Sequence, residues 1–436
     1  MARMYVPHMT FDAIFVPDGI RGAVSDLAWL EAMLEAERAL AAAEAAAGVI
    51  PSGVVAAIAE GCQIERIDPE RVLAAGRASG NPAEPLVRAL RETVGGEAAD
   101  YVHFGATSQD IIDTAAMLVA RRALGLLLEE LDRVADACAG LAGAHRATPM
   151  AARTLLQQAV PTTFGLKAAG WLVAVVSARG RLRAIRDTGL AVQLGGAAGT
   201  LAALGADGLA VIERFAAELD LPEPVLPWHT DRTRIAELGS ALATGAGVCA
   251  KIGLDVALLE QIEVGELREA AAGGSTTMPQ KRNPVGSALA FACARRAAAA
   301  ASMLTAGLVA EHERPVGAWH AEWGALSDAL ASAGGAAAAI GGVLGGLEVD
   351  AARMRANLEL GGGAVMSERL VSLLTAQIGR EEALSRLKAA IGSGRSLGEE
   401  LAGELPAEAF EPDGYLGSAS DFIDRALAVY REEAAR

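Results

Sequence analysis

Aromatic residues, cysteines and positive charges are scarce in this chain of 436 residues. Phe, Trp and Tyr make up 4% of the sequence, whereas Ala runs recur and apolar residues reach 52%. Because Ala is the best helix former, this composition favours helices that pack closely through small side chains. The formal net charge of −16 argues against nucleic acid and anionic membranes as partners. An acidic substrate therefore needs a local cationic pocket.

The four cysteines lie far apart and form no Cys-x-x-Cys pair. This spacing predicts buried thiols in a reducing cytosol rather than a disulfide framework or a metal site. They are Cys62, Cys138, Cys249 and Cys293. The first residues, MARMYVPHMTFD, contain no apolar segment of the kind found in secretory signals, so we expect a cytoplasmic protein.

One uncharged stretch, residues 329–347, is long enough to cross a membrane. It consists mostly of Ala and Gly, which drive insertion weakly, and Asp328 and Glu348 flank it. We therefore expect a buried helix in a soluble bundle. The same expectation holds for the uncharged segment 297–310.

Apolar periodicity predicts helices along almost the whole chain, and strand patterns are nearly absent. Residues 26–47 carry Leu27, Leu30 and Leu34 among Ala and Glu, an amphipathic pattern. Five later segments exceed ordinary globular helices in length and predict a long bundle; they are 109–145, 161–188, 231–270, 285–310 and 320–347. The pattern then shortens to 351–359, 365–378, 380–392 and 419–434.

We therefore predict an all-α fold of three helical domains. An N-terminal helical domain covers residues 1–106, and a central long-helix bundle covers 107–350. A small helical domain covers 351–436.

The segment from Gly273 to Pro284, GGSTTMPQKRNP, combines Gly, Pro, hydroxyl and cationic residues between two predicted helices. Gly and Pro predict a loop, and on residue types alone a polar turn between helices remains an alternative. The segment resembles the signature loop of the fumarase/aspartase superfamily, roughly G-S-S-x-M-P-x-K-x-N-P. Thr276 replaces the usual second Ser. The resemblance implies the same helical fold, with the long central domain forming the core of a homotetramer and with active sites shared between subunits.

Two further segments resemble substrate-binding parts of this superfamily. In HFGATSQD, the hydroxyls of Thr107 and Ser108 can bind a carboxylate at a helix start, although both residue types are also ordinary N-caps. His103 matches a His of the adenylosuccinate lyase branch and has a structural role as its alternative. In PWHTDRTR, Arg232 and Arg234 can grip carboxylates, or begin a solvated helix.

A third segment, RTLLQQAVP, resembles the superfamily's R-T-H-x-Q-x-A-x-P pattern, with Gln157 at its conserved amide. The His that helps to protonate the leaving group is replaced by Leu155, and the Glu that supports it is replaced by Ala288. Expelling an amine or hydroxide needs a proton, whereas a carboxylate, whose conjugate acid has a pKa of roughly 4, leaves without one. The joint loss therefore favours making or breaking a bond between carbon and a carboxylate oxygen, as in lactonisation.

The strings FGATSQDIIDTA, QQAVPTTFGLKAAGW and EHERPVGAWHAEW are similar to the 3-carboxy-cis,cis-muconate cycloisomerase branch, although Asp231 and Thr233 depart from its pattern. This resemblance implies lactonisation of a tricarboxylate in the protocatechuate (beta-ketoadipate) pathway. Ser275 is then the expected proton carrier, and Lys281 and Asn283 hold the carboxylate beside the carbanion. We expect no cofactor, because the substrate itself carries the activating groups, and no metal, because His312 and His320 lack the spacing of metal ligands.

The sequence leaves two alternative functions open. One is a fumarate-releasing lyase of the adenylosuccinate or argininosuccinate type, because MPQK and KRNP also occur in those branches. The other is a non-catalytic structural homologue, against which the set Ser275, Lys281 and Asn283 argues.

Overall fold

The computed structural model describes residues 11–271, 273–274 and 277–434. These residues are predominantly helical, which confirms the predicted fold class. The chain divides into two compact units that each combine three separate stretches of sequence. Unit 1 comprises Met1–Glu130, Ala178–Gly247 and Leu289–Ala338; unit 2 comprises Leu131–Ser177, Val248–Ala288 and Ala339–Arg436.

Several long helices contribute residues to both units, because the unit boundaries fall inside them. They are α7 (Ser108–Ala144), α8 (Phe164–Ala184), α10 (Thr233–Glu260), α11 (Val285–Ala306) and α12 (Ala318–Gly345). Each lies within a few residues of the segment predicted from apolar periodicity, except that α10 ends at Glu260, ten residues before the predicted end at 270. The division into three domains remains a prediction.

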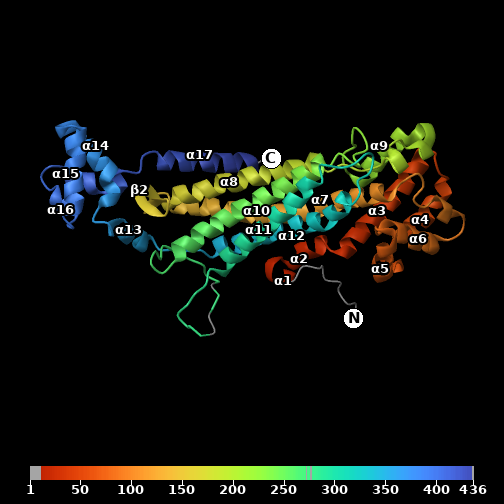
Figure 1. Ribbon diagram of the computed structural model, residues 1–436, viewed down its shortest axis with the longest axis horizontal. Helices are drawn as coiled ribbons and strands as arrows, with labels where there is room; N and C mark the ends of the chain where they lie inside the picture. The colour runs from red at the N-terminus through yellow and green to blue at the C-terminus, as the bar shows by residue number, and fades with distance from the viewer. Residues whose placement is uncertain (1–10, 272, 275–276, 435–436) are drawn as a thin grey trace. The chain divides into compact units, whose positions relative to one another are not determined.

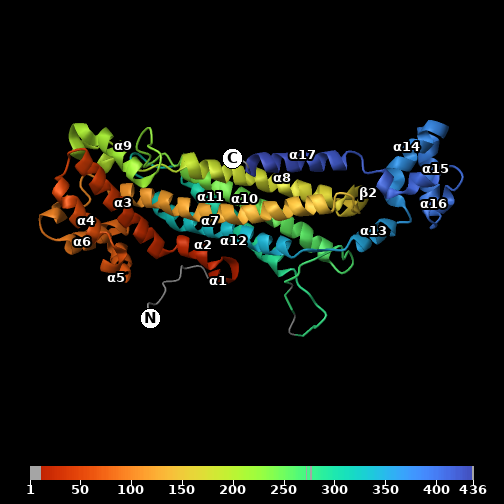
Figure 2. The same cartoon turned by 180° about the vertical axis from the view of Figure 1, so that it is seen from behind.

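Unit 1 adds shorter helices to these long ones, namely α1 (Asp12–Phe15), α2 (Asp18–Ala23), α3 (Asp26–Ala46), α4 (Val55–Gly61), α5 (Pro69–Ser79), α6 (Ala83–Val94) and α9 (Gly208–Leu219). Helix α3 packs against α4 and α9, and α6 packs against α4 and α5 (Figures 1 and 2). Local capping explains where these helices begin. The hydroxyl of Ser25 accepts the N–H of Ala28 at the start of α3, and the Asp68 carboxylate accepts that of Arg71 in α5.

The uncharged stretch predicted to be a buried helix lies in α12, and its residues 329–337 are all buried. Helices α10 and α12 have the length and apolar composition of a membrane span, yet 50% and 67% of their most apolar windows are buried by protein. Small residues allow close approach here. A Cβ at Gly335 would lie 2.4 Å from the carbonyl oxygen of Phe15, so only Gly fits.

Unit 2 contains the two short sheets of the described residues. Strands β1 (Pro149–Thr154) and β2 (Gln157–Thr163) form an antiparallel hairpin, and β3 (Leu267–Arg268) pairs antiparallel with β4 (Glu348–Val349). The sequence did not predict the hairpin. Besides the long helices, unit 2 contains α13 (Ala351–Glu359), α14 (Ser367–Ile378), α15 (Arg380–Gly392), α16 (Leu397–Glu400) and α17 (Ala419–Ala434). Figure 1 shows α14, α15 and α16 gathered together.

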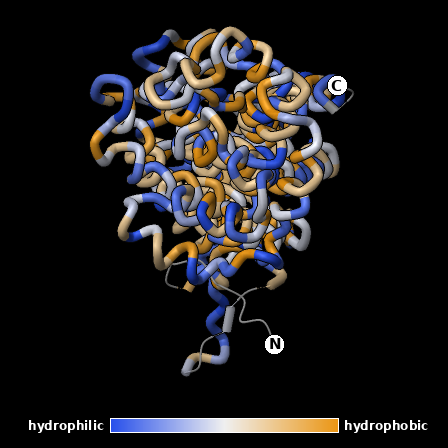
Figure 3. Tube along the Cα trace, turned by 90° about the vertical axis from the view of Figure 1, so that its right-hand side faces the viewer, coloured by the Kyte–Doolittle hydropathy of each residue, from blue (hydrophilic) through white to orange (hydrophobic). Residues whose placement is uncertain are grey.

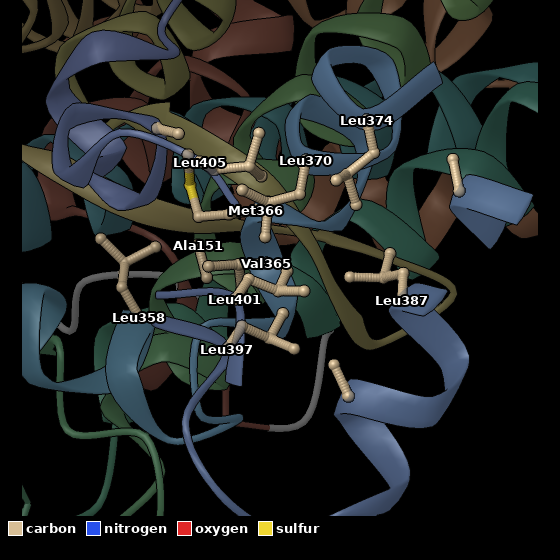
Figure 4. Packing of buried hydrophobic residues seen from close by; sticks show 13 residues of the cluster. Ala151, Leu358, Val365, Met366, Leu370, Leu374, Leu387, Leu397, Leu401 and Leu405 are labelled. Atoms are coloured by element: carbon tan, nitrogen blue, oxygen red, sulfur yellow. The ribbon is translucent and has the colours of Figure 1, made fainter. Parts of the chain in front are cut away.

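A compact apolar cluster forms the core of the C-terminal helices of unit 2. Leucines from α14, α15 and α16 meet there, with Ala151 of β1 and Val365 and Met366 of the turn before α14 (Figure 4). Burial of such side chains stabilises the fold by about 1.5–3 kcal/mol each. Along the helices, hydrophobic positions recur between hydrophilic ones, as the tube in Figure 3 shows.

Three of the four cysteines are buried as predicted, whereas Cys62 is only half-buried; none of the four forms a disulfide. Burial raises the pKa of Cys138 to about 12, so this thiol stays protonated at neutral pH. A packing role for these side chains follows.

Candidate active site

The start of α7 gathers polar groups from separate parts of unit 1. Thr107 immediately precedes the helix, and its backbone N–H donates to the Asp110 carboxylate over 3.0 Å. Asp110 lies at the third helical position, where a carboxylate also interacts favourably with the helix dipole. Ser108 is the first residue of α7 and is half-buried. Thr107 therefore occupies the N-cap position, and its contact with Asp110 is the N3-to-N-cap half of a capping box.

Asp110 connects this helix start to two other segments. Its carboxylate accepts the backbone N–H groups of Gly195 and Gly196, both at 2.9 Å, and contacts Nε2 of His229 at 2.7 Å. The Asp110 side chain is fully buried and that of His229 nearly so. A buried carboxylate with this many donors holds the backbone of Gly195 and Gly196, and the segment around His229, against α7.

His103 is held by a buried carboxylate rather than pointing into open space. Its Nδ1 lies 2.6 Å from Oε1 of Glu37 on α3, and its backbone has a φ of 62°. Burial lowers the pKa of His103, but the charge and hydrogen bond of Glu37 outweigh burial and raise it above its ordinary value. The contact supports the structural role that the sequence left open, and a substrate role remains a prediction.

Arg232 was expected to bind a substrate carboxylate, and the structure gives it another role. Its Nη1 and Nη2 donate to Asp113 over 2.8 and 3.0 Å, and Nη2 and Nε donate to Glu322 over 2.6 and 3.1 Å. Its side chain is 2% exposed. With every guanidinium nitrogen already donating to a protein acceptor, Arg232 has a structural role, and direct substrate binding by it stays a prediction.

Arg234 lies beside this network and is only half-buried. Its guanidinium donates to the carbonyl of Gly189 and stacks 4.9 Å from the ring centre of Trp228, on which Arg232 also stacks. Burial lowers the pKa of Arg234, although Asp231 opposes this effect. Its substrate role stays a prediction.

Arg314 belongs to the same polar cluster, and our sequence-based site assignment missed it. Its Nη1 donates to the Thr107 hydroxyl over 2.9 Å, and Nη2 lies 3.3 Å from the carbonyl of Ala197. Its buried Nε–H has no acceptor among the described residues. The string EHERP contained this residue, but only the fold reveals that it reaches the start of α7. It places a cation directly beside one of the predicted carboxylate ligands.

In unit 2, position 155 lies at the tip of the β1–β2 hairpin. Thr154 pairs with Gln157, so Leu155 and Leu156 form a two-residue turn, and their φ angles are 51° and 63°. Left-handed backbone costs a non-Gly residue roughly 1–2 kcal/mol, and such turns prefer Asn-Gly. The two side chains are 97% and 75% exposed. The tip therefore presents apolar side chains at the cost of backbone strain, with the predicted ligand Gln157 adjacent and exposed.

The signature loop also lies in unit 2, where its described residues project away from the flanking helices (Figures 1 and 2). Gly273 and Asn283 exchange both backbone hydrogen bonds, at 3.0 and 2.9 Å, and so close the loop. Lys281 is exposed, and the Asn283 side chain donates to the carbonyl of Gly274. Ser275, the expected proton carrier, lies outside the described residues.

A cavity of about 480 Å³ lies elsewhere in unit 1. Trp29 and Trp323 line it, together with the carboxylates of Asp12, Asp26 and Asp328. The three carboxylates outnumber Arg21, the cation that also lines the cavity, which disfavours an anionic ligand, so this cavity does not suit a tricarboxylate. Among the described residues, no group of three or more His, Cys, Asp or Glu side chains is arranged to hold a metal ion.

A family model described as lyase matches residues 17–298, more than half of the chain. The chain belongs to this lyase family. The 3-carboxy-cis,cis-muconate cycloisomerase of Bradyrhizobium diazoefficiens is 47% identical over 428 residues, covering 94% of this chain and 95% of that protein. The nitrosuccinate lyase of Streptomyces davaonensis is 46% identical over 436 residues, covering 94% of this chain and 92% of that protein.

Solved structures of the lyase family agree with the fold. The crystal structure of the 3-carboxy-cis,cis-muconate lactonizing enzyme from Pseudomonas putida matches with a TM-score of 0.92 at 41% identity. The match covers 98% of this chain and all of that one. The superfamily inferred from the signature loop is thereby confirmed.

Proposed function

We propose that the protein is a 3-carboxy-cis,cis-muconate cycloisomerase, which forms 4-carboxymuconolactone in the breakdown of aromatic acids. In this reaction a carboxylate oxygen of the substrate adds across a C=C bond, and the carbanion formed next to another carboxylate takes up a proton. All atoms of the substrate remain in the product. The names of the relatives from Bradyrhizobium and Pseudomonas support this assignment.

The observation that carries the proposal is the apolar hairpin tip. Leu155 stands where relatives with basic leaving groups need a proton donor, and its neighbour Leu156 is also apolar. Ala288, in the first turn of α11, has no carboxylate that could orient such a donor. A reaction that breaks or makes a bond between carbon and a carboxylate oxygen needs neither group, because a carboxylate is a weak base.

In the proposed mechanism, segments from different subunits of the assembly contribute residues to each active site. Lys281 and Asn283 bind the carboxylate next to the developing carbanion, where positive charge and N–H groups stabilise the transition state most. Ser275 carries the proton. Thr107 and Ser108, and from the hairpin Gln157, orient the remaining carboxylates, with no metal or other cofactor assigned a role. Arg314 strengthens the cationic side of this site, because it already contacts Thr107.

Elimination from nitrosuccinate is a second candidate, because the Streptomyces relative bears that name at 46% identity. Nitrite, like a carboxylate, is the conjugate base of an acid much stronger than an ammonium ion. Its loss therefore needs no donated proton either, and Leu155 with Ala288 suits this reaction equally well. Adenylosuccinate and argininosuccinate, by contrast, release amine-type groups that need an acid.

A parallel assay of three substrates tests the assignment. The purified protein is incubated with 3-carboxy-cis,cis-muconate, nitrosuccinate and adenylosuccinate, and we follow loss of diene absorbance, release of nitrite and formation of fumarate. We expect fast lactonisation, with the Ser275→Ala variant lower by about 10² to 10⁴ as a control for contaminating enzymes. Faster nitrite release would assign the second candidate instead, and turnover of adenylosuccinate at a comparable rate would refute the leaving-group argument.

The proposed assembly is a cytoplasmic homotetramer with shared active sites. Between residues 289 and 306, the exposed side of α11 carries Phe291, Met303 and several Ala, with Arg295 as its only charged residue. Such an apolar surface on a long helix is typical of a subunit interface. Sedimentation velocity should give about four times the chain mass of 44.5 kDa, and a monomer would contradict the assembly.

A further inference from the structure

The helix that follows the signature loop is capped from the other side of the loop. Pro284 immediately precedes α11, and the side chain of Asn283 donates to Gly274 instead of accepting from the helix. The first N–H groups of a helix have no intrahelical acceptor and form a partial positive charge. Two of them, on Gly286 and Ser287, therefore need an acceptor from elsewhere.

Glu269 supplies this acceptor from the other side of the loop. Its Oε2 accepts the Gly286 N–H over 3.0 Å, and its Oε1 accepts the N–H and the hydroxyl of Ser287 over 3.0 and 2.6 Å. Glu269 directly follows β3 and is 2% exposed. Its own N–H donates to Glu260 at the end of α10. The carboxylate thus connects the chain entering the loop to the helix leaving it.

Together with the Gly273–Asn283 pair, this contact gives the loop a stem with two connections. Asn283 belongs to this stem, and Lys281 lies two residues from it toward the loop tip, six residues before Ser287 along the chain. Closing a loop through a rigid stem restricts the positions that its side chains sample. A shift of about 1 Å in a catalytic group can cost roughly 10²-fold in rate.

We propose that Glu269 is a positioning residue for the signature loop, acting through the N-terminus of α11 on Lys281 and Asn283. Assigning catalytic consequence to this contact rests on the proposed function of the loop. Glu269 itself touches no substrate. Its effect should therefore appear mainly in kcat, because the charge on the substrate carboxylate grows as the carbanion forms.

The test compares Glu269→Gln with the control Glu348→Gln. Gln has only one oxygen, so its NH2 group must face a donor N–H of either Gly286 or Ser287, and the cap is half lost. Glu348 lies opposite Arg268 on β4 and is exposed, so its substitution leaves the stem intact. We measure kcat and KM separately, and the rate of tryptic cleavage after Lys281 and Arg282 at a temperature where both variants are folded.

We expect Glu269→Gln to lower kcat by about 10- to 100-fold while KM changes little, and to accelerate tryptic cleavage in the loop. Glu348→Gln should match the parent in kcat and in the rate of tryptic cleavage. Ser287→Ala removes one of the three hydrogen bonds and should give a smaller effect in the same direction. If Glu269→Gln does not fold, this milder variant decides between an altered and an unaltered loop.

Parental kcat together with parental cleavage in the folded variants would overturn the proposal. So would a lower melting temperature with unchanged kcat and cleavage, because Glu269 would then only stabilise the fold. If the parent turns over nitrosuccinate instead of carboxymuconate, the same kcat comparison is made there. If it turns over neither, the proposed function fails separately, and unaltered cleavage in Glu269→Gln still overturns the positioning role.

Discussion

Replacing Arg232 by Met should destabilise unit 1 strongly. Its direct effect should be on folding stability and not on substrate binding. The guanidinium lies between the buried carboxylates of Asp113 and Glu322, and its removal leaves both without their cationic partner. Breaking a buried ion pair from one side costs about 3–5 kcal/mol. At about 2–4 °C per kcal/mol, the expected fall in melting temperature is roughly 6–20 °C.

The fall in melting temperature caused by Arg232→Met should depend on pH. Burial raises the pKa of Glu322 above its ordinary value even beside Arg232, so the folded state binds that proton more tightly than the unfolded state. As the pH falls through this raised pKa, Glu322 becomes neutral and one of the two unpaired charges disappears. The difference in melting temperature between parent and Arg232→Met should therefore be larger at pH 8 than at pH 5.

Arg234→Met is the matched control. Arg234 stacks on the same Trp228 ring but is half-buried and has no carboxylate pair of its own. The Arg234→Met variant should lose little stability. If Arg234 binds substrate, the variant should also have a higher KM than the parent. Differential scanning fluorimetry and steady-state kinetics on both variants provide the measurements. An Arg232→Met enzyme with parental melting temperature and a raised KM would refute the structural role and restore the original expectation for Arg232.

Three further predictions concern other parts of the chain. Lys281→Met should reduce kcat more than it raises KM, and steady-state kinetics showing only a raised KM would make Lys281 a docking charge. Leu155→His should lower lactonisation activity or stability, because Ala288 offers no carboxylate to orient the ring; a faster enzyme would show that leaving-group protonation limits the rate. Burial raises the pKa of Glu44 to about 9, so the parent should lose stability as the pH rises from about 4.5 to 9, by at most about 1.4 kcal/mol per pH unit. Glu44→Gln should remove this dependence in denaturant titrations, and an unchanged slope would contradict it.

The helices were predictable because their signals are local. Apolar periodicity and Ala content predicted α13 and α15 to the residue and most of the long helices within a few residues, whereas the predicted segment for α10 was ten residues too long at its C-terminal end. The β1–β2 hairpin was missed for a physical reason. Its turn consists of Leu155 and Leu156, neither of which favours left-handed backbone, so the usual Asn-Gly or Asp-Gly signal is absent.

The candidate site was predictable in part. The motifs located the start of α7, the hairpin tip and the signature loop, since each is a short contiguous string. They could not distinguish Arg232 from Arg234, because only tertiary packing places two carboxylates around the first. Arg314 and Glu269 were missed for the same reason. Arg314 contacts Thr107, 207 positions away, and Glu269 contacts Gly286 and Ser287, 17 and 18 positions away.

The apolar exposed side of α11 has a consequence for handling this enzyme. If a second copy covers that side, then association stabilises the folded chain by mass action, and the melting temperature rises with protein concentration. An assay at nanomolar enzyme then samples a different population from a melting experiment at micromolar enzyme. Specific activity that falls on dilution and returns on concentration is the behaviour this helix predicts.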